Sequence, residues 1–126
     1  MADGKRVLGD PERLSLLLGI CNRLPEVQVS GDQHIAFRVR KKTFAYYQDD
    51  HHGDGVVCLN CKSTAKRQSE LVAGHPDRYF VPGYVGTKGW VALRLDLPEI
   101  DWSEVEELVT AAYRLQAPKR ILEQFE

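Results

Sequence analysis

The sequence has no long apolar run. The longest, residues 14–21, is short and is interrupted by Ser15 and Gly19. A helix that crosses a bilayer needs about 20 mainly apolar residues. Residues 1–6 also lack the apolar core and the cleavage site of a secretory signal. We therefore expect no membrane partner and a cytoplasmic location.

Cysteine is scarce and present in odd number, with three residues in the chain. This argues against a disulfide framework and for a reducing compartment. Cys58 and Cys61 form a C-x-x-C motif, which raises a zinc or redox interpretation. On a strand, residues three apart point to opposite faces, and a redox pair instead begins at a helix N-terminus. We expect no metal here unless the strand assignment fails and His51 and His52 complete a ligand set.

No catalytic constellation is recognisable, so we expect no catalytic residue and no cofactor. The loop 49–54 is rich in Asp and His, but its spacing does not match an EF-hand, and we interpret it as a solvated hairpin loop. Residues 83–89 combine glycines with a lysine, yet they fail the phosphate-loop pattern and no helix is predicted after them. His34 and His75 have no identifiable acid or nucleophile partner in the sequence.

The net charge of −1 neither favours nor excludes a nucleic-acid partner, but its distribution is uneven. Residues 1–95 carry 14 Lys and Arg against 10 Asp and Glu, whereas residues 96–126 carry 3 against 8. Such asymmetry is typical of proteins with a charged partner, and equally of an acidic helix with a solvated side.

The chain of 126 residues is predicted to form a single domain, residues 1–126. Asp10 and Pro11 predict a helix start, and Pro25 its end. Alternating patterns then predict strands in residues 27–29, 34–40, 43–48 and 56–61. A helix capped by Ser63, two strands at 78–81 and 89–95 and a helix capped by Asp101 or Ser103 follow. A short last helix over 119–125 is predicted to turn Ile121, Leu122 and Phe125 inward. The order α-β(3-4)-α-β(2)-α predicts an α+β fold, a two-layer antiparallel sheet of about five strands backed by helices.

Basic residues crowd the predicted hairpin tips. Cations gathered on one surface neutralise phosphates and release counterions, which is the basis of nucleic-acid binding. Tyr47 or Tyr84 beside them would stack on bases or fill the core, and Trp90 would anchor the base of the second tip. The candidate cations are Arg38, Arg40, Lys41 and Lys42 at one tip, Lys88 at the other, and Lys62, Lys66 and Arg67 at the start of the second helix.

Several stretches together resemble the MmcQ/YjbR family of small bacterial proteins. Their order and spacing run through residues 10–125, nearly the whole chain. These stretches are Leu24-Pro25-Glu26-Val27, His34–Val39 with Lys42–Ala45, Arg78–Tyr84, Gly89–Leu93 and Ala112–Lys119.

The resemblance implies an α+β domain with a helix-backed antiparallel sheet, similar in topology to secretion chaperones. It also implies DNA binding through two projecting hairpins, described as wings. Here these would be the tips Arg40–Lys42 and Gly86–Gly89. The resemblance carries over no catalytic residue.

The leading hypothesis is a non-enzymatic DNA-binding protein that holds duplex DNA weakly and in a salt-dependent way. One alternative is a protein-interaction or chaperone-like module, binding a protein partner or forming a homodimer. A second is a small-molecule binder or unrecognised enzyme with a pocket between Tyr79, Tyr84, Trp90 and Arg94. The predicted nucleic-acid contacts are Arg38, Arg40, Lys41, Lys42, Lys66, Arg67, Tyr84, Lys88 and Trp90.

Overall fold

The computed structural model describes residues 10–50, 53 and 55–125, with the side chain of residue 125 excepted. The predicted roles of His51, His52 and Asp54, and the inward side chain predicted for Phe125, lie outside what is described. The helices are α1 (Pro11–Asn22), α2 (Ala65–Gly74), α3 (Trp102–Gln116), α4 (Lys119–Phe125) and the 3₁₀ turn η3 (Val85–Lys88). The strands are β1 (Val27–Ser30), β2 (Ile35–Val39), β3 (Lys42–Asp49), β4 (Val57–Cys61), β5 (Tyr79–Phe80) and β6 (Val91–Arg94).

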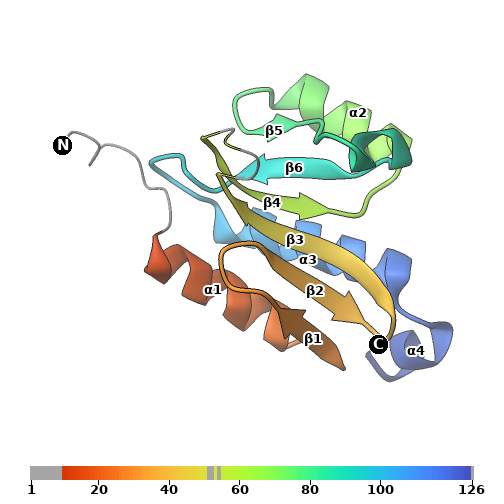
Figure 1. Ribbon diagram of the computed structural model, residues 1–126. Coiled ribbons are helices and arrows are strands. Elements are labelled where there is room, and N and C mark those ends of the chain that lie inside the picture. The colour runs from red at the N-terminus through yellow and green to blue at the C-terminus, as the bar shows by residue number, and fades with distance from the viewer. Residues whose placement is uncertain (1–9, 51–52, 54, 126) are drawn as a thin grey trace.

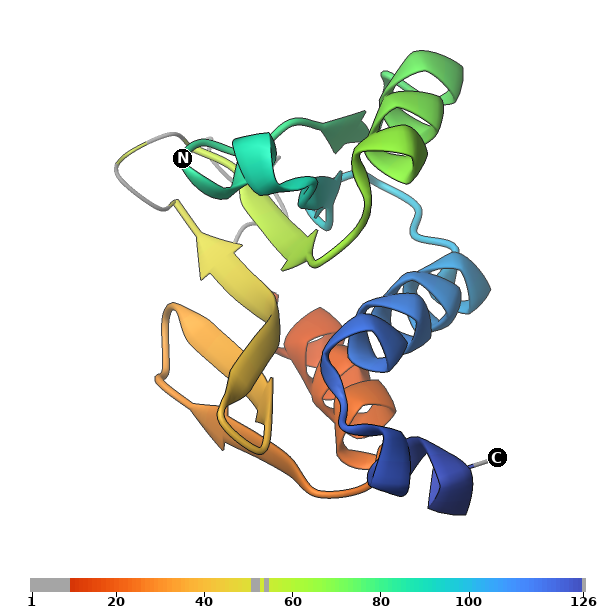
Figure 2. The same cartoon turned by 90° about the vertical axis from the view of Figure 1, so that its right-hand side faces the viewer.

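The strands form one six-stranded antiparallel sheet in the order β1-β2-β3-β4-β6-β5 (Figure 1). Helices α1 and α3 lie against one face of this sheet, and no α-helix of the described residues covers the opposite face (Figure 2). The α+β architecture is thus confirmed, with one strand more than the five expected because residues 27–30 pair fully with β2. None of the described helices is long and apolar enough to cross a bilayer.

The helix starts follow from side-chain caps. Asp10 accepts hydrogen bonds from the backbone N–H groups of Glu12, at 2.8 Å, and Arg13, as predicted. Asp101 caps α3 in the same way, so the alternative cap Ser103 is wrong. The predicted cap of α2 is also wrong by one position: Thr64 accepts from the backbone N–H of Arg67, at 3.1 Å, while Ser63 is buried.

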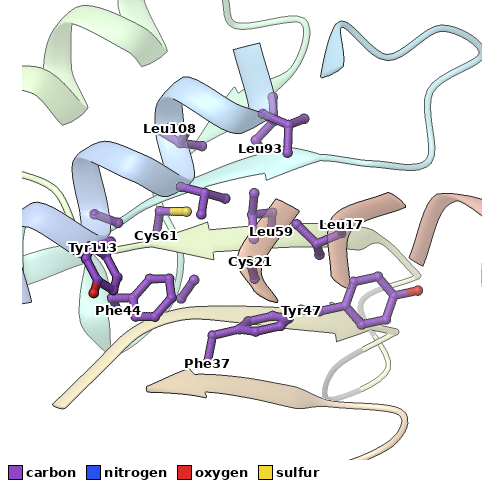
Figure 3. Packing of buried hydrophobic residues seen from close by; sticks show 14 of the residues in the cluster. Leu17, Cys21, Phe37, Phe44, Tyr47, Leu59, Cys61, Leu93, Leu108 and Tyr113 are labelled. Carbon is purple, nitrogen blue, oxygen red and sulfur yellow. The ribbon is translucent and has the colours of Figure 1, made fainter. Parts of the chain in front are cut away.

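The hydrophobic core lies between the helices and the sheet (Figure 3). Phe44 and Tyr113 meet edge to face with ring centroids 5.5 Å apart, and both are fully buried. The Tyr113 hydroxyl donates to the carbonyl oxygen of Pro25 at 2.7 Å, which joins α3 to the chain entering β1. This places the C-terminal half of α3 beside the start of β1.

The other face of the sheet has a different character. Strand register aligns Tyr46 of β3, Asn60 of β4 and Ala92 of β6 side by side. Because side chains alternate along a strand, these residues face away from the helices. We call this the uncovered face.

The two cysteines of the C-x-x-C motif lie on opposite faces of β4, as the strand assignment requires. Cys61 faces the core near Cys21, whereas Cys58 faces the other way, and all three thiols are free and buried. Burial raises the pKa of the Cys21 thiol to about 12 and that of Cys61 well above its usual value. These thiols therefore stay protonated, and unreactive as nucleophiles, at neutral pH.

We expect none of the three thiols to react rapidly with a thiol-specific reagent in the native protein at pH 8. In denaturant all three should react at the rate of an unhindered cysteine, because unfolding restores solvent access and an ordinary pKa. Mass spectrometry after timed alkylation measures this directly. Rapid native labelling of Cys58 or Cys61 would contradict their placement in β4.

Candidate nucleic-acid interface

The topology brings separate basic segments to one end of the sheet. In an antiparallel sheet, the β2–β3 turn, the end of β4 and the start of β6 must share an end. The backbone N–H of Lys62 donates to the carbonyl of Phe44 at 2.9 Å, and the Lys62 ammonium lies 3.5 Å from the carbonyl oxygen of Lys88. Strands β3, β4 and β6 therefore bring three basic segments together, at the right-hand end of Figure 1.

Two helices add cations to this end. Helix α2 begins directly after β4, and it presents two basic residues in its first turn. Gln116, the last residue of α3, donates to the carbonyl of Thr43 at 3.0 Å, so the C-terminal end of α3 also lies here. We call this region the basic end; it comprises Arg40, Lys41, Lys42, Lys62, Lys66, Arg67, Lys88 and Arg114.

The cations of the basic end differ in how far carboxylates neutralise them. The guanidinium of Arg40 lies 2.6 Å from the Glu26 carboxylate, and this hydrogen bond raises the pKa of Arg40. Lys66 and Arg67 share Glu70 at about 4 Å in exposed pairs, which contribute little. Within the described part of the chain, Lys41, Lys42 and Lys88 are exposed and form no ion pair. These three lysines are therefore among the described cations available to an external anion.

The opposite end of the sheet is acidic. The arginines there are engaged locally: Arg13 donates to the carbonyls of Leu95 and Leu97, Arg78 pairs with Glu104 at 3.0 Å, and Arg94 pairs with Asp96 at 2.9 Å. The protein is thus polarised along its strands, although its net charge is −1. The acidic residues near this end are Asp10, Asp32, Asp49, Asp50, Asp77, Asp96, Glu99 and Asp101.

The second tip does not project as a hairpin wing, and that expectation is wrong. Residues 85–88 form the η3 turn, which folds back against α2. The Gln68 amide donates to the carbonyls of Gly86, at 2.8 Å, and Trp90, at 2.7 Å. Gly89, with φ of 90°, lies close to the segment that follows β4. A Cβ atom at position 89 would be 2.9 Å from the Ser63 carbonyl oxygen. Lys88 is therefore held on a packed turn.

The aromatic residues divide between core and surface. Tyr47 is buried in the core, so its suggested stacking role is wrong. Trp90 is 6% exposed and packs 5.6 Å from the Tyr46 ring, which leaves it a structural anchor rather than a stacking surface. Tyr84 is 87% exposed. Arg38 lies exposed on the uncovered face, and its Nε donates to the Thr43 hydroxyl at 3.2 Å.

The pocket predicted between Tyr79, Tyr84, Trp90 and Arg94 does not form. Tyr79 is directed to the helix side, where its hydroxyl donates to Glu104 at 3.0 Å, and burial raises its pKa. Arg94 lies on the other face, bound to Asp96. Tyr79 and Arg94 meet only at the edge of a small depression of about 260 Å³, and neither Tyr84 nor Trp90 lines it.

A groove of about 510 Å³ separates α2 from α3 beside the basic end. Its lining is mixed in charge, because Lys62, Arg67 and Arg114 line it together with Glu104, Glu107 and apolar side chains of both helices. Arg114 was missed as a candidate because it belongs to the acidic C-terminal segment. The available signal was a basic residue in the last turn of a helix, which favours the helix dipole.

Comparison with known proteins agrees with this fold. The model of the YjbR family matches residues 22–115, and the chain belongs to this family. The crystal structure of Deinococcus radiodurans protein DR2400, with a DUF419 domain, superposes with a TM-score of 0.68 and 22% identity. That match covers 81% of this chain and 76% of the other. No curated protein matches the chain.

The packed position of Lys88 can be tested at Gly89. We expect Gly89→Ala to lower the free energy of unfolding by roughly 1–3 kcal/mol, because Ala is strained at positive φ and its Cβ would meet the Ser63 backbone. Gly83→Ala is the matched control, since no atom lies within 4 Å of its Cβ position. Urea unfolding of both variants measures the difference. Equal stabilities would contradict the close contact between Gly89 and the backbone of Ser63.

Proposed function

We propose that this YjbR-family protein binds duplex DNA through phosphate contacts made by its basic end. The observation that carries the proposal is the meeting of Lys41, Lys42 and Lys88, from two distant segments, at one end of the sheet without described carboxylate partners. Unpaired cations on one surface release counterions when they meet a polyanion. The acidic opposite end disfavours phosphate and would orient the protein on the duplex.

The spacing of the two tips suits a nucleic-acid groove. In the sheet order β2-β3-β4-β6, the β2–β3 turn and the start of β6 are two to three strands apart. Neighbouring strands lie about 4.8 Å apart, which gives a separation of roughly 12 Å. The major groove of B-form DNA is also about 12 Å wide, so the tips could contact phosphates on both of its sides.

The chemistry of the contacts predicts binding without sequence readout. Lysine ammonium groups act as point charges on phosphates and carry no information about the bases. The β2–β3 turn and the η3 turn, which carry the three lysines, are too short to read several base edges. Binding should therefore be weak, steeply salt-dependent and nearly equal for different duplexes.

Fluorescence anisotropy of labelled duplex DNA, measured between 50 and 200 mM salt, is the test. We expect the variant with Lys41, Lys42 and Lys88 all changed to Glu to lose binding while keeping its fold by circular dichroism. The single variant Lys88→Gln should reduce the slope of log K against log salt by about 0.9, the value for one lost phosphate contact.

Ser15→Glu is the matched control for the Lys88→Gln variant. It also lowers the net charge by one, but on an exposed position of α1 away from the basic end. We expect its salt slope to equal that of the unaltered protein. Equal losses in the two single variants would mean that only net charge matters, and undiminished binding by the triple variant would refute the site.

The protein-interaction alternative has one observation in its favour. The groove between α2 and α3 is lined by Leu71, Leu108 and Leu115, and Leu115 is 47% exposed. Such a groove suits an apolar peptide better than a phosphate backbone. Absence of DNA binding at the lowest salt, with a dimer detected by light scattering, would favour this function.

A further inference from the structure

The uncovered face contains a cavity separate from the basic end. It has a volume of about 590 Å³ and lies between the β1–β2 turn and the segment 80–85 that follows into η3. Cavities of about 300–1,000 Å³ are typical of small-molecule sites. Its walls include side chains of β2, β3 and β4, among them Tyr46, Gln48 and Asn60, and its rim includes His34, Phe80 and Tyr84.

Asn60 at the floor of this cavity has an unsatisfied polar atom. The residue is 3% exposed and is the last but one of β4. Its Nδ2 donates to the Gln48 Oε1 at 3.0 Å, but its Oδ1 has no hydrogen-bond partner among the described residues. A buried acceptor left without a donor costs about 1–3 kcal/mol. If β4 served packing alone, a hydrophobic residue at position 60 would avoid this cost in stability.

The two groups of the Asn60 amide differ in what they offer a ligand. Its Oδ1 is a free acceptor, whereas its Nδ2 is engaged by Gln48 Oε1. Asn60 can thus accept a hydrogen bond from a ligand directly, and can donate one to a ligand that displaces the half-buried Gln48 side chain.

Aromatic side chains flank this polar floor. Tyr46 lies opposite Asn60 in the sheet register, and Phe80 and Tyr84 stand across the cavity. Tyr84 adopts φ 61° and ψ −64°, and the N–H of Val85 donates to the Gly83 carbonyl at 2.6 Å. This is a three-residue γ-turn of a strained kind, which presents an exposed aromatic ring at the rim.

The lining selects for an uncharged ligand. None of the described residues that line this cavity is Lys, Arg, Asp or Glu. A buried amide with aromatic neighbours is the combination that recognises unpaired bases, through stacking and through hydrogen bonds to their edges. Side-chain amides also pair with adenine by donating and accepting at once.

We propose that the uncovered face binds a neutral heteroaromatic ring with an amide-like edge, namely a nucleobase, between Tyr46, Phe80 and Tyr84 and above Asn60. The ring stacks on the aromatic side chains, and its edge satisfies the polar atom of Asn60 that is unused in the free protein. The site needs no phosphate, so it is independent of the basic end.

The test is a titration with the four common ribonucleosides, which carry no phosphate, and with a single-stranded tetranucleotide. Two-dimensional ¹H–¹⁵N NMR follows the side-chain amides of Gln48 and Asn60. We expect saturable shifts at these groups and along residues 80–85. Shifts with nucleosides identify a free base as sufficient, whereas shifts with the tetranucleotide alone identify a base carried on a strand. No shift at these amides with either probe overturns the proposal.

Two variants test the assigned residues. Asn60→Leu keeps a similar volume and removes the unsatisfied group, so we expect an equal or higher melting temperature with at least tenfold weaker binding. Tyr84→Asn removes the exposed ring, and Asn tolerates positive φ, so we expect weaker binding with the fold unchanged. Binding by Asn60→Leu as tight as by the unaltered protein overturns the role of the amide.

The variant with Lys41, Lys42 and Lys88 changed to Glu separates this site from the DNA-binding proposal. We expect it to bind nucleosides normally, because none of these lysines lines the cavity. Loss of nucleoside binding in this variant would contradict the independence of the two sites.

Discussion

The rest of the structure depends on the complete burial of the central strand β4. All five of its residues are buried, although only one face of the sheet is covered by helices. Its inner side chains complete the core, and its outer side chains are enclosed by neighbouring strands and the segment leading to η3. Because β4 is fixed from both sides, its exit at Lys62 is fixed as well. The residues that follow β4 position the start of α2, and Gly89 packs against these residues. The position of β4 therefore determines the arrangement of the basic end.

Charge separation along the strands explains how a chain of almost zero net charge can still present a cationic surface. Arginines at the acidic end bind carboxylates and backbone carbonyls, whereas Lys41, Lys42 and Lys88 at the basic end are exposed. Such a dipolar arrangement keeps local fields strong over distances near the Debye length, about 8 Å at physiological salt. Composition therefore understates the capacity of this protein for electrostatic binding.

Much of the fold could be predicted from sequence because local signals were strong. Asp10 followed by Pro11 predicts the start of a helix, and the alternation of Ile35, Phe37 and Val39 predicts a half-buried strand. Neither prediction requires tertiary information. The Gly86–Gly89 tip could not be predicted, because its conformation depends on hydrogen bonds from Gln68, 18 residues or more away in the chain. Nothing in the local pattern shows that the loop folds back on α2.

The sequence predicts the grouping of the basic tips but misses one member of the basic end. Lys41, Lys42 and Lys88 are candidates from their charge and their predicted turns, whereas the contribution of Arg114 depends on α3 ending beside β3. The lack of a hydrogen-bond partner for Asn60 Oδ1 could likewise not be predicted from the sequence. An asparagine in an apolar strand shows an unsatisfied polar atom only when its neighbours in space are known. Long-range register decides both features.

The proposed DNA binding requires cations from distant segments to act as one phosphate-binding surface at the basic end. Two-dimensional ¹H–¹⁵N NMR of the protein titrated with a short duplex at low salt tests this requirement. We expect backbone amides of residues 40–43, 62–67 and 86–89 to shift together with a single affinity. Shifts confined to one of these segments, or located at the acidic end, would contradict it.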